Sequence, residues 1–412
     1  MRLPSGARRH TSYRARSLHR GLVIALSLSL ITSCSTDTSQ TSPTASGDAS
    51  NEQQQNCVVA DASTLVPETG ALFGVNLDWE DRTLAEFSAD AGVRPAVTVS
   101  FVTFPLSDAD SANLDAAANQ VATNGGALLV TLEPTAGLDT VTDTTANEFA
   151  SRVSRYNNSG VPVIVRFAHE MNGTWYSWGQ QPAEYIRAFR TVAAAIHNNA
   201  PGSSMMWAPN NASGYPFTGG SAQAQPGTDN FASLDTNGDG ELTINDDAYA
   251  PFYPGDDVVD WVGMSLYHWG SVHPWGENEL PEEGKFAAQL TGTYVGLGGD
   301  ESAAPDFYQI YGVDHNKPIA IPETAALVVA GADTDTELAI KQAWWRQVFS
   351  DELPTRFPQI KMINWFEWNK LEPEVGAEVD WTVTSTPAIQ SAFRGDRPSW
   401  LIYATENRCA AD

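Results

Sequence analysis

Side chains that could do chemistry gather directly after an apolar run in VPVIVRFAHEMNGTWYSWG at 161–179. The charged and polar members of this group are Arg166, His169, Glu170 and Asn172. A second glutamate, Glu323, lies near the end of another apolar run, KPIAIPET at 317–324. A retaining enzyme that cleaves a glycosidic bond needs a carboxylic acid and a carboxylate nucleophile about 5–5.5 Å apart. We predict that these two glutamates form such a pair, although a solvated loop position is the ordinary alternative for each glutamate alone.

Large aromatic rings accompany these residues, and the chain contains 13 tryptophans. A ring face can stack on the apolar face of a pyranose and leave the sugar hydroxyls free. Core packing is the usual alternative, and it is expected for Trp344 and Trp345 because they fall within an expected helix. We assign sugar contacts first to Trp175 and Trp365. The rings expected near the ends of apolar runs are Trp175, Trp178, Trp269, Trp275, Trp365 and Trp368.

The elements that must position these residues are eight apolar runs with helix-like stretches between many of them. Most runs are continuous rather than alternating, which is typical of parallel strands that are covered on both faces. Helices are expected at 182–199 and 337–349. The pattern predicts an α/β fold with a single (β/α)8 TIM barrel, in which active sites lie at the carboxyl ends of the strands. The runs are 71–78, 95–104, 126–134, 161–170, 203–210, 258–267, 317–324 and 360–369.

In such a barrel Glu170 ends the fourth strand and Glu323 ends the seventh, so both side chains can meet over one sugar. Apolar residues beneath a glutamate and rings around it would raise its pKa, which suits a general acid. The same rim should carry further polar groups. Candidates at the other strand ends are Glu133, Tyr267, His268 and Glu367.

The run from Arg166 to Trp178 resembles the signature of glycoside hydrolase family 26, retaining (β/α)8 enzymes best known as β-mannanases. Weaker similarity in strand order covers 70–405. The resemblance implies that Glu170 is the acid/base and Glu323 the nucleophile. It also implies that His169 contacts the sugar or holds the nucleophile, whereas strand alternation leaves a hydrogen-bonded core histidine as the alternative. The substrate-binding set that we predict is Arg166, His169, Asn172, Trp175, Tyr267, Trp269, Trp365 and Trp368, with Trp368 competing with Trp365 for the eighth-strand position.

Departures from a typical mannanase affect the expected substrate more than the reaction. They are Thr324-Ala325-Ala326 after the second glutamate and the stretches 265–279 and 364–370. We expect a β-linked polysaccharide as substrate, with mannan as the first expectation and β-1,3/1,4-glucan and β-1,3-xylan as the alternatives. A non-catalytic glycan-binding lipoprotein is one alternative, but a binder needs no opposed carboxylate pair. A solute-binding protein for a transporter is another, but it would need two lobes.

The stretch DTNGDGELTIND at 235–246 has the spacing of an EF-hand or dockerin calcium loop. Gly240 at the sixth position permits the sharp turn that such loops need. One loop is present where a dockerin normally has two, so docking to cohesin is not expected. We predict structural Ca²⁺ between the fifth and sixth strands, with a metal-free acidic loop as the alternative, and no catalytic cofactor. The oxygen ligands would come from Asp235, Asn237, Asp239, the Glu241 carbonyl, Thr243 and Asp246.

The N-terminal segment reads as a targeting signal. Residues 1–20 hold six arginines, and an apolar run at 21–33 that is too short to span a bilayer leads to Cys34. The run LITSC resembles the bacterial lipoprotein box, which implies cleavage before Cys34 and its lipidation, with an ordinary signal peptide as the alternative. We therefore expect a signal peptide at 1–33, a disordered lipid-anchored linker at 34–56 and a catalytic domain at 57–412.

Charge and cysteine usage narrow the partners and the compartment. The formal net charge of −27 disfavours nucleic acid and anionic lipid, but it leaves neutral polysaccharides unaffected. In an exported chain Cys57 and Cys409 most economically form a disulfide, with two free thiols as the alternative. We expect a monomer, secreted or held by its lipid on the outer face of a bacterial membrane.

Overall fold

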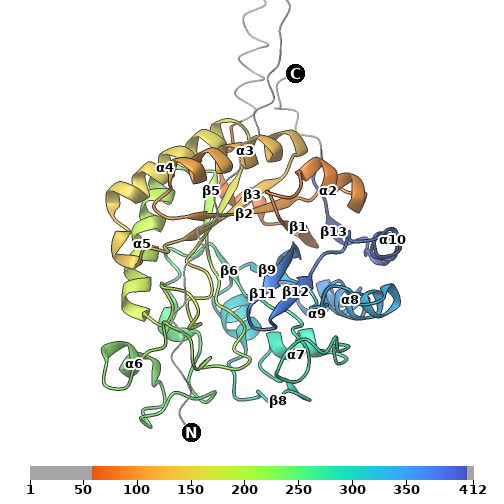
Figure 1. Cartoon of the computed structure of the whole chain (residues 1–412). Coiled ribbons are helices and arrows are strands. Elements are labelled where there is room, and N and C mark those ends of the chain that lie inside the picture. Colours follow the sequence, from red (N-terminus) through yellow and green to blue (C-terminus); the bar gives the residue numbers. More distant parts are fainter. Residues whose placement is uncertain (1–57, 406–412) are drawn as a thin grey trace, which may run out of the picture. The chain divides into compact units, whose positions relative to one another are not determined.

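The computed structural model describes residues 58–405, and their centre is a closed barrel of eight parallel strands (Figure 1). The strands neighbour one another in the order β1-β2-β3-β4-β5-β6-β9-β10, and a pairing between β10 and β1 closes the ring. This confirms the predicted barrel. The strands are β1 (Ala71–Leu77), β2 (Val97–Thr103), β3 (Ala127–Glu133), β4 (Val163–Phe167), β5 (Ser203–Trp207), β6 (Trp261–Gly263), β9 (Ile319–Thr324) and β10 (Ile360–Glu367).

Helices surround the barrel. Several of them are preceded by a residue whose side chain accepts a hydrogen bond from a backbone N–H of the first turn. Asp333 caps α8 in this way. The helix therefore begins at Thr334, before the predicted start at residue 337. The helix predicted at 182–199 is α5. The longer helices are α2 (Leu84–Ala91), α3 (Asp108–Asn124), α4 (Asp143–Asn158), α5 (Pro182–Asn199), α8 (Thr334–Val348) and α10 (Pro387–Asp396), and the shorter ones are α6 (Asp229–Leu234), α7 (Lys285–Leu290) and α9 (Leu353–Arg356).

Two apolar layers hold the barrel together, one inside the ring of strands and one between the strands and the helices. Successive side chains of a strand point to opposite faces, so neighbours fall in different layers. On β3, Leu129 belongs to the inner cluster, whereas Leu128 and Val130 belong to the outer one. Both layers are almost fully buried. The strand ends are thereby fixed relative to one another, as a site built from several strands requires.

Three short additions extend this core. The two-residue strand β13 (Leu401–Ile402) pairs with β1 beside the barrel. A hairpin of β7 (Val295–Gly296) and β8 (Gly299–Asp300) follows the sixth barrel strand, and a hairpin of β11 (Asn369–Glu372) and β12 (Ala377–Asp380) follows the last.

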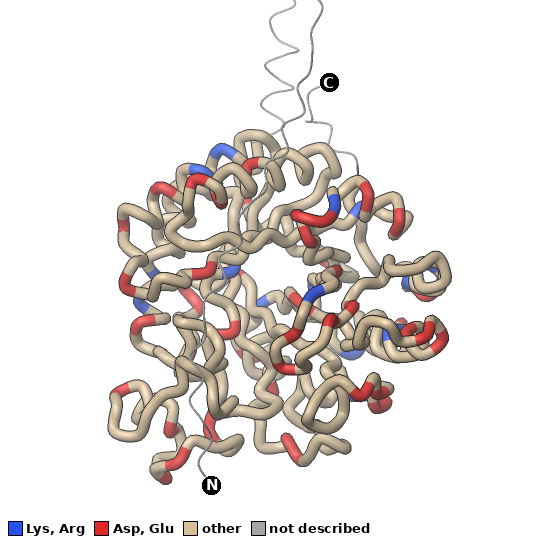
Figure 2. The backbone as a smooth tube through the Cα atoms, in the orientation of Figure 1, with Lys and Arg blue, Asp and Glu red and all other residues tan. Residues whose placement is uncertain are grey.

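Acidic residues are spread over the helices and loops that enclose the barrel (Figure 2). The whole chain has 50 acidic and 23 basic side chains, so this surface is strongly negative. None of the helices within 58–405 has the length and apolar character needed to cross a bilayer. The signal peptide, the linker, Cys34, Cys57 and Cys409 lie outside the described residues and stay predictions.

Candidate active site

A strained turn places Glu170 at the barrel mouth. Strand β4 ends at Phe167, and the backbone then turns, with φ of 46° at Ala168 and 55° at Glu170. Positive φ is uncommon for such residues, and it persists where the surroundings fix the backbone, often at functional sites. The N–H of Ala168 donates to Leu132 O at 2.8 Å, and the N–H of Glu170 donates to Ala208 O at 2.9 Å. The turn is therefore tied to both neighbouring strands.

Glu323, on β9, has both carboxylate oxygens engaged. Arg166 Nη1 forms an ion pair with Oε1, and the Tyr267 hydroxyl donates to Oε2 at 2.7 Å. Glu323 is 6% exposed and Arg166 is fully buried. The carboxylate is thus held in one orientation by partners on two other strand ends. A nucleophile needs this kind of fixed placement.

The two glutamates interact electrostatically at the barrel mouth. Arg166 Nη2 donates to Ser265 Oγ at 2.8 Å, and Ser265 is one of the groups that lower the pKa of Glu170. Arg166 therefore joins Ser265 to Glu323, and the charges of Arg166 and Glu323 both act on Glu170. The structure brings the predicted pair together. Sequence reasoning missed Ser265, although it stands two positions before Tyr267 and strand alternation places both on one face.

The surroundings of Glu170 favour its protonated form. Burial, joined by the negative charge of Glu323, raises the pKa of Glu170 to about 7, while Arg166 and hydrogen bonds from Ser265 and Trp175 act in the opposite direction. A carboxylic acid with a pKa near neutrality carries a proton that it can donate. The two glutamates therefore differ chemically: Glu170 favours the protonated form, whereas Glu323 is a carboxylate held by Arg166 and Tyr267.

His169 is a buried, hydrogen-bonded histidine. Its Nε2 lies 3.1 Å from the Tyr176 hydroxyl, and its ring packs against Phe101 and Trp178 at 5.7 and 5.8 Å. Burial, with the Arg166 charge, holds the pKa of His169 well below its usual range, so the ring is neutral. No hydrogen bond joins it to Glu323 within residues 58–405. This environment matches the core alternative rather than a sugar contact.

Asn172, predicted to bind substrate, instead shapes a loop. Its side-chain amide donates to Asn210 O at 2.8 Å, and its Oδ1 accepts from Asn210 N–H at 2.8 Å. The residue is fully buried. Because both amide groups are used on one backbone position after β5, Asn172 braces the rim rather than offering a free group to a sugar.

Trp175 is the most exposed of the rim tryptophans, at 38%. Its Nε1 donates to Glu170 Oε2 at 3.0 Å, and its ring packs edge-on against Phe217 at 5.1 Å. The ring is thus fixed beside Glu170, and part of its surface is free. This placement agrees with the predicted sugar contact.

Other rings border the mouth near Tyr267. Trp269 is half-buried and Trp381 is buried, and each lies edge-on to the other at 5.0 Å; Tyr267 lies 5.3 Å from Trp381. Trp368 is half-buried and stacks on Phe366 at 5.7 Å. Trp381 was not predicted, because its position after the β11–β12 hairpin leaves no trace in local spacing.

Trp365 contradicts its prediction as a sugar platform. It is fully buried and packs against Trp345, Phe349 and Phe393 at 6.3–6.5 Å between centroids. The cause is alternation on β10: Met362 faces the barrel interior, so Trp365, three positions later, faces the helices. Trp178, Trp344 and Trp345 are also buried, and the last two are core residues as predicted.

Two further rim candidates are structural. His268 Nε2 hydrogen-bonds Glu279 O at 2.8 Å, and burial lowers the pKa of this histidine to about 4. Glu367 accepts from Val383 N–H at 2.9 Å and from the Thr384 hydroxyl, and burial raises the pKa of Glu367 to about 6. Both oxygens of Glu367 and the Nε2 of His268 are thus used on protein groups other than the paired glutamates.

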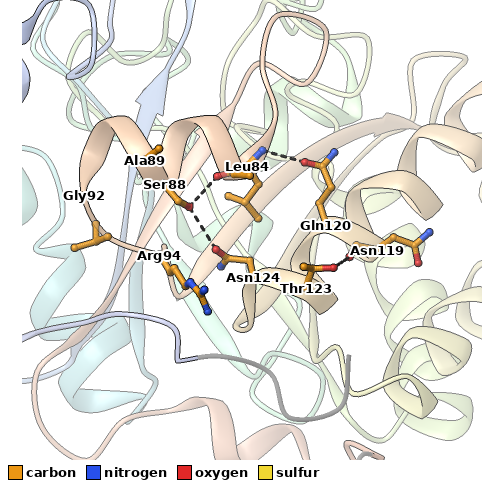
Figure 3. A pocket seen from close by; sticks show the side chains of 11 residues that line it. Leu84, Ser88, Ala89, Gly92, Arg94, Asn119, Gln120, Thr123 and Asn124 are labelled. Atoms are coloured by element: carbon orange, nitrogen blue, oxygen red, sulfur yellow. Dashed lines mark hydrogen bonds between the residues drawn. The ribbon is translucent and has the colours of Figure 1, made fainter. Parts of the chain in front are cut away.

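Two hollows lie away from the paired glutamates. One separates α2 from α3 on the helical layer, where Ser88 Oγ donates to Leu84 O at 2.8 Å and Gln120 Oε1 accepts from Leu84 N–H at 3.0 Å (Figure 3). Its lining is mostly small and neutral. The other lies at the carboxyl ends of β1 and β10 and includes Asp78 and Arg82. Neither contains Glu170 or Glu323.

The loop 235–246 lies between β5 and β6, as predicted. Asp235 and Asp239 accept backbone N–H groups of the loop itself, and Gly240 has φ of 87°. Asp246 is buried and accepts from Thr243 N–H at 2.9 Å. Within 58–405 no group of three or more His, Cys, Asp or Glu side chains is arranged to hold a metal. The oxygen-only ligand set still fits the chemistry of calcium, so the site stays a prediction.

Replacing Trp175 by phenylalanine should move the alkaline limb of activity to higher pH. The Trp175 hydrogen bond stabilises the charged form of Glu170, so its loss raises the pKa of that acid. A weaker proton donor should also lower kcat/KM by roughly 3- to 10-fold. The pH profile of kcat/KM measures both effects. Trp269→Phe is the control, and an equal shift in that variant would argue against a specific contact.

Comparison with known proteins agrees with this geometry. The model of "Glycosyl hydrolase family 26" matches residues 122–230, which include β3, β4 and Glu170. An endo-beta-1,4-mannanase double mutant of Cellulomonas fimi superposes with a TM-score of 0.55 and 16% identity, covering 87% of this chain and 77% of that one. GH26C of Muricauda sp. MAR_2010_75 superposes with a TM-score of 0.52 and 12% identity, covering 85% of this chain and 91% of that one. At these identities the likeness establishes the fold.

Curated relatives match at higher identity over shorter shares of their length. Endoglucanase H of Acetivibrio thermocellus is 23% identical over 67% of this chain and 25% of its own length. A beta-1,3-xylanase of Alcaligenes sp. is 26% identical over 49% of this chain and 38% of its own. The chain therefore spans well under half the length of these relatives. Together with the family model and the shared fold, these matches confirm the resemblance of the chain to glycoside hydrolase family 26.

Proposed function

We propose that the chain is a retaining glycoside hydrolase that cleaves β-linked polysaccharide by double displacement. The observation that carries the proposal is a pair of unlike carboxyl groups at the barrel mouth, in which the charge of Glu323 acts on the buried Glu170 and Arg166 links Glu323 to Ser265. Within it, burial raises the pKa of Glu170 to about 7, while Arg166 and Tyr267 clamp Glu323. A double displacement needs these two different carboxyl groups.

In the first step, a Glu323 oxygen forms a bond to the anomeric carbon while the bond to the leaving oxygen breaks. Glu170 gives its proton to that oxygen, so the leaving sugar departs as an alcohol. In the second step, Glu170, now a carboxylate, takes a proton from water. The water oxygen attacks the anomeric carbon and frees Glu323. Each step inverts the anomeric carbon, so the product keeps the β configuration.

The substrate that we propose is β-mannan, with β-1,3/1,4-glucan and β-1,3-xylan as the other candidates. The names of the relatives support this range, since they include mannanases, an endoglucanase and beta-1,3-xylanases. The half-exposed ring of Trp175 beside Glu170 suits a pyranose at the cleavage point.

A panel of these polysaccharides, tested by reducing-end release and product sizing, decides between catalysis and binding. We expect turnover of at least one of them, with β-configured products by NMR at early times. Binding without cleavage, seen in affinity electrophoresis, would favour a non-catalytic glycan-binding protein. Products that appear first in the α configuration would contradict double displacement.

We also propose that the loop 235–246 binds Ca²⁺ and stiffens the insertion between β5 and β6. A metal held only by the folded chain stabilises it by about 2.7 kcal/mol at a hundredfold excess over Kd. Chelation by excess EDTA should therefore lower Tm by several degrees, and added CaCl₂ should restore it. In CaCl₂ the Asp239→Ala variant should have a lower Tm than the wild type. Its Tm should also fall less than that of the wild type when EDTA is added. An unchanged melt in EDTA would contradict the proposal.

A further inference from the structure

Glu133 is a third carboxyl group at the barrel mouth. It is the last residue of β3 and stands in register with Thr103 of β2. Leu129 faces the barrel interior, so alternation places Thr131 and Glu133 on the same inner side. The next strand, β4, carries the turn with Glu170. Glu133 is therefore a neighbour of the acid/base along the rim.

The Glu133 carboxylate has no protein partner. Over the described range 58–405, it makes neither a hydrogen bond nor an ion pair, although the residue is half-buried. Two carboxylates at other strand ends differ: Glu323 and Glu367 use both oxygens on protein donors. A half-buried carboxylate loses favourable hydration, so its free acceptor capacity is costly unless a ligand uses it.

Charged groups from several elements face Glu133. Glu323 on β9, Glu170 beyond β4 and Asp110 on α3 repel its charge, whereas Arg166 on β4 attracts it. Burial, followed by the charge of Glu323, raises the pKa of Glu133 to about 7. The hydroxyl of Tyr176 also feels the charges of Glu133, Glu170 and Glu323. All three carboxyl groups therefore act on one another at the same mouth of the barrel.

We propose that Glu133 is a substrate-binding residue whose carboxylate accepts hydrogen bonds from hydroxyls of the sugar unit at the cleavage point. The inference rests on the proposed function and assigns a role that neither catalytic step needs. A carboxylate has two oxygens and about four acceptor positions, so it can hold two neighbouring hydroxyls. It would thereby select sugars by the placement of those hydroxyls, which the aromatic rings cannot do.

Glu133→Gln tests this role on the polysaccharide that the wild type cleaves. Loss of a charged acceptor should lower kcat/KM by about 10- to 100-fold, chiefly through KM. Glu148→Gln is the matched control, since that glutamate is exposed on α4, and its kinetics should equal those of the wild type. Thermal unfolding of each variant shows whether the fold is intact, and Glu133→Asp should recover part of the loss.

The pH dependence of KM gives a readout that a structural role would not move. The charged carboxylate accepts the sugar hydroxyls, so KM of the wild type should rise as pH falls through about 7, the pKa of Glu133. Glu133→Gln should have a KM that no longer varies over this range. A variant with wild-type KM at every pH would overturn the proposal while leaving the glycosidase function intact.

Calorimetry with an oligosaccharide of the same polysaccharide separates the two proposals. If the wild type binds the oligosaccharide but never cleaves the polymer, the hydrolase function fails, and an unchanged Kd in Glu133→Gln would also overturn the role of Glu133. A Kd weakened about 10- to 100-fold would sustain that role without catalysis. A wild type that neither binds nor cleaves any sugar of the panel would overturn both.

Discussion

Replacing Glu170 by alanine should lower kcat on polysaccharide by about 10²–10⁴-fold. The leaving oxygen of a polysaccharide is a poor leaving group without a proton, and Glu170 is a buried carboxyl group at the cleavage point whose pKa is raised to about 7. The same residue must later take a proton from water, so both steps slow in the variant. Initial rates of reducing-end release measure the effect, with Glu148→Gln as the exposed control.

A substrate that needs no protonation sharpens this test. A 2,4-dinitrophenyl glycoside releases 2,4-dinitrophenolate, a stable anion, so the first step should survive in Glu170→Ala, and the glycosyl-enzyme should accumulate. Azide needs no general base, so it should attack the intermediate, speed turnover and give the β-glycosyl azide. If the variant cleaved polysaccharide and the activated glycoside with equal losses and ignored azide, Glu170 would have no acid/base role.

The barrel could be predicted from the chain because each strand is a continuous apolar run. Strands covered on both faces need apolar residues at every position, and that signal survives without tertiary information. Strand ends are less clear: the apolar run 258–267 contains only three strand residues, Trp261–Gly263. The sequence also indicated Glu170 and Glu323, because chemistry at a barrel rim follows the ends of strands.

The errors concern which way a side chain points. Trp365 was expected at the rim, yet one step of alternation turns it into the helical layer. Asn172 was expected near the sugar, but its side chain contacts Asn210, whereas His169 lies against Tyr176, as its core alternative would have it. Side-chain directions of this kind are set by contacts with neighbouring segments, which no local pattern reveals.

Contacts between residues that are far apart in the chain could likewise not be predicted from the sequence. Arg166 and Glu323 are 157 positions apart, and Arg166 and Ser265 are 99 apart. Composition indicates that a buried arginine needs an acidic partner but not which of the 50 acidic residues supplies it. The network that distinguishes the two glutamates is therefore a product of the closed barrel.

Replacing Glu323 by alanine should lower activity by at least about 10⁴-fold, more than any other single change, since no covalent intermediate can form. The variant also leaves Arg166 without its carboxylate partner, and breaking a buried ion pair is destabilising. Glu323→Gln, which keeps an acceptor for the Tyr267 hydroxyl, should be equally inactive with a smaller loss of Tm. Comparing the activity and the Tm of the two variants separates the loss of catalysis from the loss of stability.

Azide distinguishes the roles of the two glutamates by stereochemistry. In Glu323→Ala, azide should occupy the space of the lost carboxylate and attack the anomeric carbon directly, so the product is the α-glycosyl azide. Glu170→Ala should instead give the β-glycosyl azide, because its intermediate has already been inverted once. A 2-deoxy-2-fluoro glycoside with a good leaving group should label Glu323 in the wild type, as detected by peptide mass. The β-azide from both variants, or a label on another residue, would remove Glu323 from the mechanism.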